Sequence, residues 1–135
     1  MLNSSERKQI MNKFLASAAF LGLLAVILGA FGAHGLENTL SQHALLRYQT
    51  GVDYQFYHVA ALLVVGLLSK NHKKIPHTLT LAGIFFIIGI FLFSSSLYLY
   101  ALTGKTYFGM VTPVGGLSFI IAWASLLLYA IKNPN

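Results

Sequence analysis

Four long stretches of this sequence are almost entirely apolar, and they limit its fold more than any other feature. They cover residues 14–33, 52–69, 79–102 and 110–131. Each approaches or exceeds the roughly 20 helical residues that cross about 30 Å of hydrocarbon. Because every backbone N–H and C=O must be paired within a bilayer, such stretches can only be helices there. The sequence therefore predicts an all-α integral membrane protein, a four-helix bundle forming a single membrane domain over residues 1–135.

The composition points to the same environment. Only 9% of the 135 residues are charged, against about a quarter in soluble domains. The chain has no cysteine, which excludes disulfides, thiolate nucleophiles and Cys-ligated metal centres. The net charge of +6 comes from Lys and Arg in short islands between the apolar stretches, whereas a nucleic-acid-binding domain gathers them on one face. Membrane lipid is therefore the expected partner, and nucleic acid is not.

The basic residues also predict how the chain crosses the membrane, because Lys and Arg in short loops stay on the cytoplasmic side. Seven of the nine lie in the N-terminal segment, in the loop between the second and third stretches, or near the C-terminus. Arg47 and Lys105 lie in the two remaining loops. We therefore expect an N-in, C-in topology, with those two loops on the outer face.

Small residues recur at helical spacing along two of the predicted spans. Gly22 and Gly29 belong to one stripe in the first span, and Gly115 and Ala122 belong to another in the fourth. Helices in lipid associate through close backbone approach, so these stripes are interpreted as packing faces.

The loop between the first two spans has the periodicity of an amphipathic helix. One helical face would carry Leu36, Leu40, Ala44, Leu45 and Tyr48. Ser41 or Asn38 can cap this helix, and Gly51 can end it. We interpret it as a separate helix that lies in the outer membrane interface.

Polar residues gather at those ends of the four spans that an up-and-down bundle brings to the outer face. The candidate ligand-binding residues are His34, Asp53, Gln55, His58, Ser94, Ser96, Tyr98 and Thr112. Unpaired polar atoms are costly in hydrocarbon, so they should find one another, water or a ligand. The expected connected cluster comprises Gln55, His58, Ser94, Ser96 and Tyr98, with His34, Asp53 and Arg47 at its mouth. His58 is the expected pivot, because it can donate, accept or change charge near neutral pH.

Each of these residues also has a purely structural interpretation. The serines can bond back to helix carbonyls, Thr112 can cap a helix, and the tyrosines near the outer face can form an aromatic belt. The histidines lack the spacing of metal or haem ligands on one helix. Ser, His and Asp occur without a nucleophile-elbow pattern. No metal, other cofactor or catalytic residue is therefore expected.

Four motifs in order resemble the domain-of-unknown-function 423 family of small four-helix membrane proteins, which is similar to eukaryotic transmembrane protein 256. They are Gly29-Ala-Phe-Gly-Ala-His-Gly-Leu36, Thr50-Gly-Val-Asp-Tyr-Gln-Phe-Tyr-His58, Leu92-Phe-Ser-Ser-Ser-Leu-Tyr98 with Leu102-Thr-Gly104, and Thr112-Pro-Val-Gly-Gly116 with Trp123. The resemblance covers nearly everything from Phe14 to Trp123. It implies a multi-pass protein of the bacterial inner (cytoplasmic) membrane, and it implies no catalytic mechanism.

The function favoured by these observations is non-enzymatic: an outward-facing polar pocket that binds or passes a small ligand, a lipid headgroup or a proton. The alternative is a small structural or assembly subunit whose polar end docks another copy of itself or another membrane protein. An enzyme acting on lipid or envelope substrates ranks third. Inward-facing polar residues would favour the pocket, and residues facing lipid would favour docking.

Overall fold

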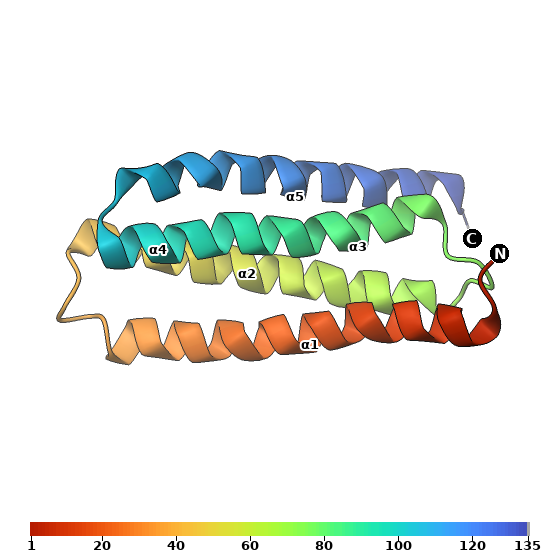
Figure 1. The fold of residues 1–135 in the computed structure, drawn as a ribbon, viewed down its shortest axis with the longest axis horizontal. Helices are drawn as coiled ribbons and strands as arrows, with labels where there is room; N and C mark the ends of the chain where they lie inside the picture. Colours follow the sequence, from red (N-terminus) through yellow and green to blue (C-terminus); the bar gives the residue numbers. More distant parts are fainter. Residues whose placement is uncertain (135) are drawn as a thin grey trace.

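The computed structural model describes the backbone of residues 1–134 and the side chains of residues 1–6 and 13–134. Four antiparallel helical rods make up the molecule (Figure 1). They are α1 (Ser4–His34), α2 (Gln42–Ser69), a third rod in which α3 (His77–Gly89), the π-helical segment η1 (Ile90–Ser94) and α4 (Ser95–Thr103) follow one another, and α5 (Thr106–Lys132). All four rods are long and apolar enough to cross a membrane. The predicted all-α four-helix membrane bundle is therefore confirmed.

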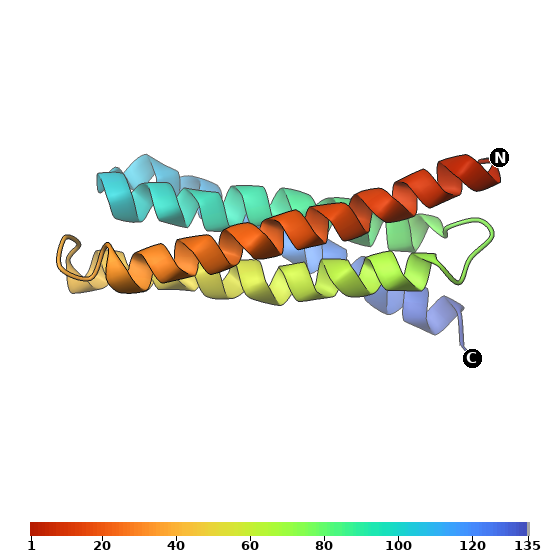
Figure 2. The same ribbon diagram turned by 90° about the horizontal axis from the view of Figure 1, so that it is seen from below.

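The two middle rods form the centre of the bundle. Figures 1 and 2 show α2 beside the α3–α4 rod, with α1 flanking α2 and α5 flanking the α3–α4 rod. The main core lies in the centre of the bundle and includes residues of α1, α2, the third rod and α5. Its most completely buried side chains include Leu62, Val65, Leu79 and Phe86. The outward faces of α1 and α5 carry many exposed large apolar side chains, as expected of surfaces that face lipid.

Both predicted small-residue stripes are packing faces. A Cβ atom on Gly22 or Gly29 of α1 would lie 3.3 Å from the side chains of Val59 and Val52 on α2. On α5, a Cβ atom on Gly115 would lie 2.7 Å from the Cα atom of Phe93 in η1. The chain therefore uses glycine where two helix backbones approach closely.

The prediction of a separate interface helix before α2 is wrong. Ser41 does cap a helix, since its Oγ accepts a hydrogen bond from the Ala44 N–H at 3.2 Å. That helix is α2 itself, which continues through Gly51 without a break. Gly51 does not end the helix but leaves room for the third rod, because a Cβ atom there would lie 2.8 Å from Cε1 of Tyr98. The apolar face that includes Leu36 and Tyr48 packs into a second core cluster within the protein.

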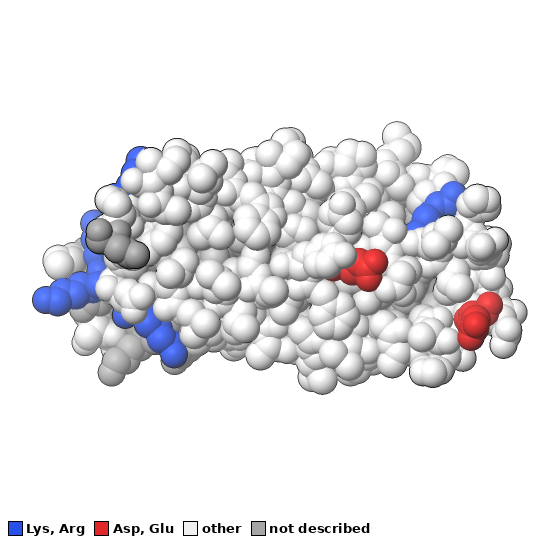
Figure 3. All heavy atoms as spheres, turned by 180° about the vertical axis from the view of Figure 1, so that it is seen from behind, with Lys and Arg blue, Asp and Glu red and all other residues white. Residues whose placement is uncertain are grey.

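The two ends of the bundle differ in charge. We call the end with residues 35–41 and 104–105 the loop end, and the opposite end, with both chain termini and residues 70–76, the terminal end (Figure 1). On the face in Figure 3, Lys and Arg gather mainly at the terminal end, and the wide middle is largely uncharged. Helix α4 stops at the loop end because Gly104 adopts a φ of 68°, which favours glycine.

Candidate functional site

The structure buries five of the eight predicted site residues, in the half of the bundle nearer the loop end. The buried residues are Gln55, His58, Ser94, Ser96 and Tyr98. Asp53 and Thr112 are half-buried, and His34 is exposed. The hydrogen bonds of the buried residues fall into three separate sets.

The first set joins three helices. The Gln55 amide donates to the Leu21 carbonyl of α1 at 2.8 Å and accepts a hydrogen bond from the Tyr98 hydroxyl of α4 at 2.7 Å. The Tyr98 ring packs 5.0 Å from the ring of Tyr48, whose hydroxyl donates to the Leu28 carbonyl of α1. These contacts satisfy the polar atoms of both tyrosines and link α1, α2 and α4.

The second set surrounds the π-helical segment. Ser94 Oγ donates to the Gly51 carbonyl of α2 at 2.7 Å. Ser96 Oγ donates to the Phe93 carbonyl at 2.8 Å and lies 2.6 Å from Oγ1 of Thr112 on α5. A π-helical turn disturbs the regular backbone pairing of a helix, and these serines supply polar contacts at that point.

The third set contains His58, whose environment is aromatic. Its Nδ1 lies 2.6 Å from the Tyr54 carbonyl, which can only accept, so Nδ1 carries the proton. The ring stacks on Phe119 with centroids 3.5 Å apart, and Phe86 and Trp123 lie about it. These are the contacts of a packed core histidine, and nothing in them supports the predicted pivot role.

Asp53 and His34 do not meet at the mouth of one pocket. The Asp53 carboxylate accepts a hydrogen bond from the Gln49 amide at 2.8 Å on the surface of α2, and His34 is in the last turn of α1. Among the described side chains, no buried nitrogen or oxygen lacks a hydrogen-bond partner. The expected single connected cluster is therefore wrong: of its five residues only Gln55 and Tyr98 bond to each other, and the other three bond to backbone carbonyls or to Thr112.

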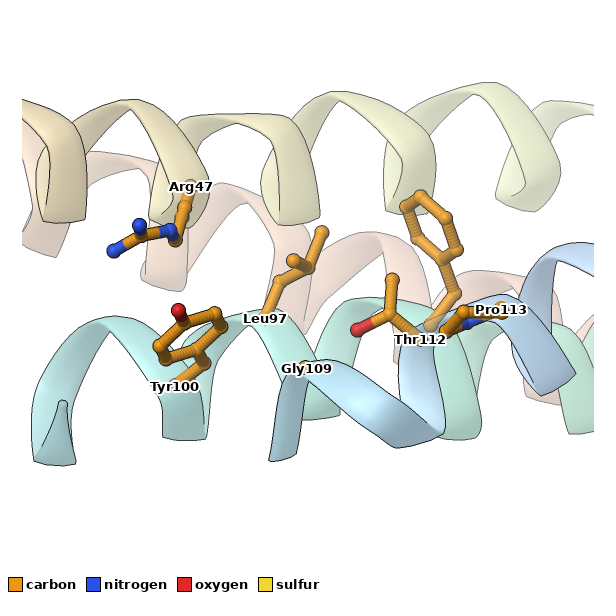
Figure 4. Close-up of a pocket in the computed structure, with 7 residues that line it drawn as sticks. Arg47, Leu97, Tyr100, Gly109, Thr112 and Pro113 are labelled. Atoms are coloured by element: carbon orange, nitrogen blue, oxygen red, sulfur yellow. The ribbon is translucent and has the colours of Figure 1, made fainter. Parts of the chain in front are cut away.

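One space that a ligand could use lies beside these residues. It is an open groove of about 390 Å³ formed by the third rod together with α2 and α5, near the loop end (Figure 4). Its lining consists of Arg47, Phe93, Leu97, Tyr100, Gly109, Thr112 and Pro113. Of the predicted site residues only Thr112 lines it, and Arg47 was expected near the mouth of the pocket.

One end of this groove is polar and the rest is mainly apolar. The Arg47 guanidinium carbon lies 4.3 Å from the centre of the Tyr100 ring, a cation–π contact that fixes the charged group. Figure 4 shows this pair at one end of the groove and Thr112 with Pro113 at the other. From the sequence, Tyr100 is expected only in the outer aromatic belt. The groove could not be predicted, because residues of three rods form it.

The depth of Arg47 follows from the length of α2. Its 28 residues span about 42 Å at 1.5 Å per residue, which exceeds a hydrocarbon core of about 30 Å. Arg47 is the sixth residue of α2, so with α2 centred in the bilayer it would lie near the boundary between headgroups and hydrocarbon. This is the level at which a basic side chain meets lipid phosphate.

The structure contains no cluster of three or more His, Cys, Asp or Glu residues that could hold a metal ion, as far as residues 1–134 are concerned.

The sequence is similar over most of its length to bacterial membrane proteins. UPF0382 membrane protein YwdK of Bacillus subtilis is 43% identical over 90% of this chain and 98% of its own length. A UPF0382 membrane protein of Haemophilus influenzae is 39% identical, with coverages of 92% and 98%. UPF0382 inner membrane protein YgdD of Escherichia coli is 41% identical, with coverages of 87% and 88%.

No solved structure matches the chain. The family described as "Protein of unknown function (DUF423)" matches residues 28–116, a region that contains Gln55, Ser94, Ser96 and Tyr98 and the whole groove lining. Taken with these relatives and the four membrane-spanning rods, this match shows that the chain is a multi-pass membrane protein of the DUF423 family.

Proposed function

We propose that the protein binds a membrane phospholipid in the groove, with the lipid phosphate at Arg47 and an acyl chain along Phe93, Leu97 and Pro113. The observation that carries this proposal is the Arg47 guanidinium, held over Tyr100 at one end of a mainly apolar groove. A membrane phospholipid has the same arrangement of an anionic group joined to an apolar chain.

The chemistry of Arg47 supports a phosphate ligand. A guanidinium presents a planar fork of N–H donors that matches two phosphate oxygens. Stacking on Tyr100 holds this fork in place before the lipid arrives, so less side-chain entropy is lost on binding. Asp53, the acid six residues further along α2, is already hydrogen-bonded to Gln49.

The alternative, an assembly subunit that docks its polar end, has less support. Docking requires polar side chains on an accessible surface, whereas Gln55, Ser94 and Tyr98 point inward and bond to other helices. A simpler interpretation of Arg47 is that it only anchors α2 at the membrane interface. The following experiment separates anchoring from lipid binding.

Replacing Arg47 with glutamine should weaken phosphatidylglycerol binding by about tenfold, the loss expected for charge-assisted hydrogen bonds. Native mass spectrometry of the detergent-solubilised protein, titrated with this lipid, measures the dissociation constant. Lys105→Gln is the matched control: it removes the same charge at the same end of the bundle, from an exposed residue outside the groove. Diacylglycerol, which lacks phosphate, should bind both variants alike.

Equal weakening by the two variants would mean that the lipid responds only to the net charge of this end. An unchanged affinity of the Arg47 variant would remove Arg47 from lipid binding. Either result would contradict the proposed function.

We also propose that the protein lies in the cytoplasmic membrane with both termini inside, which the charge difference between the two ends supports. The name of the Escherichia coli relative, an inner membrane protein, also supports this location. Because the chain has no cysteine, single cysteines can report topology without background. In intact cells or spheroplasts, a membrane-impermeant maleimide should label Asn38→Cys and leave Asn71→Cys unlabelled. The reverse pattern would overturn this orientation.

A further inference from the structure

Thr112 presents a hydrogen-bond acceptor to the groove. Ser96 Oγ has one proton and donates it to the Phe93 carbonyl, which can only accept. Either hydroxyl could donate in the 2.6 Å contact between Ser96 Oγ and Thr112 Oγ1, but both contacts of Ser96 are hydrogen bonds only when Thr112 is the donor, and the inference uses this arrangement. With its proton used, the Thr112 hydroxyl can only accept a hydrogen bond from a ligand in the groove that it lines.

Gly109, on the same helix, has a carbonyl without its regular helical partner. Its carbonyl would normally accept from the N–H four residues later in α5, but that residue is Pro113, which has no N–H. Gly109 and Pro113 both line the groove. The Gly109 carbonyl therefore lacks its regular helical donor, and the charged donor of the groove is Arg47 on the facing helix α2.

Helix register places Thr112 deeper than Arg47. Arg47 stacks on Tyr100, and a Cβ atom on Gly109 would also meet the Tyr100 ring, so these three residues lie at one level. Thr112 bonds to Ser96, which precedes Tyr100 by four residues on the same helix. At 1.5 Å per residue, Thr112 lies about 6 Å further from the loop end.

We infer that the preferred ligand is a lysophospholipid, a single-chain lipid whose glycerol keeps a free hydroxyl. This inference rests on the proposed function. This hydroxyl lies between the phosphate and the acyl chain, so it would reach the Thr112 acceptor when the phosphate is at Arg47. In a diacyl phospholipid the same oxygen is esterified and can only accept. The groove volume of about 390 Å³ lies near the lower end of ligand sites of roughly 300–1,000 Å³.

The test compares two single-chain lipids that differ only in this hydroxyl. They are 1-palmitoyl-lysophosphatidylcholine and its 2-O-methyl ether, each titrated below its micelle-forming concentration and measured by native mass spectrometry. The choline headgroup has no hydrogen-bond donor, so the glycerol hydroxyl is the only one present. We expect the free hydroxyl to bind about fivefold more tightly than the ether, the effect of one good hydrogen bond.

Thr112→Val should reduce this preference to less than about twofold, because it removes the acceptor while keeping the side-chain shape. Ser96 keeps its bond to the Phe93 carbonyl in this variant. Thr112→Ser retains the hydroxyl and should retain the preference. Arg47→Gln should weaken both lipids by the same factor.

Each outcome decides a different claim. Equal binding of the two lipids to the unaltered protein would overturn the lysophospholipid inference. This measurement does not depend on the folding of any variant. If Arg47→Gln still weakened phosphatidylglycerol binding, the proposed function would stand. A full preference retained by a folded Thr112→Val protein would also overturn the inference, because the acceptor would then not be Thr112.

Discussion

Replacing Gly115 with alanine should lower the free energy of unfolding by about 3 kcal/mol, or prevent folding, because the added methyl group has no space. A Cβ atom at this position would lie 2.7 Å from the Cα atom of Phe93 and 2.8 Å from the backbone carbon of Leu92. These are backbone atoms of the π-helical segment, which cannot rotate away as a flexible side chain can. The two helices would have to separate.

Gly116→Ala is the matched control for this prediction. Its added Cβ atom would lie 3.9 Å from the Phe93 ring, an ordinary van der Waals distance, and alanine favours a helix over glycine. Unfolding in mixed micelles can be followed through the fluorescence of Trp123, the single tryptophan, which packs edge-on against Phe86. Similar stabilities of the two variants would show that α5 and the third rod are not in such close contact.

The Gln55–Tyr98 hydrogen bond should behave as a coupled pair in a double-mutant cycle. Gln55→Leu leaves the Tyr98 hydroxyl buried without its acceptor, and Tyr98→Phe leaves the Gln55 carbonyl without its donor. Each single change should cost about 2 kcal/mol of unfolding free energy. The double variant should cost less than the sum by about 1 kcal/mol, near the upper range for hydrogen bonds between membrane helices.

The same fluorescence measurement gives all four stabilities of this cycle. Ser118→Ala serves as a control, because its hydroxyl bonds only to the Val114 carbonyl within α5 and should show no coupling to Tyr98→Phe. Strict additivity between Gln55→Leu and Tyr98→Phe would contradict the interhelical hydrogen bond.

The fold could be predicted from the sequence because a bilayer leaves few choices. The lengths of the apolar stretches require helices, and the small residues at Gly22 and Gly115 marked contact faces correctly. The interface helix was mispredicted because glycine at position 51 has two uses. It can end a helix, or it can admit a neighbouring ring, and only the position of Tyr98 decides between them.

The arrangement of the site was less accessible to sequence reasoning. The burial of Gln55, Ser94 and Tyr98 follows from their polarity at membrane depth. Which of them bond together depends on the rotation of each rod, and η1 changes that rotation within the third rod. The groove depends on three rods at once, since Arg47, Tyr100 and Thr112 each come from a different one.

The packing of the rods also has a consequence for the order in which the molecule assembles. Helix α1 packs mainly on α2, and α5 packs mainly on the third rod, so each outer helix is held by a neighbour along the chain. Each pair can form as a hairpin once its second helix enters the bilayer, because its contacts are local in sequence. Joining the two hairpins is then the last step, and the bonds from Tyr98 to Gln55 and from Ser94 to Gly51 cross that junction. These polar contacts thus set the register in which two preformed halves of the protein meet.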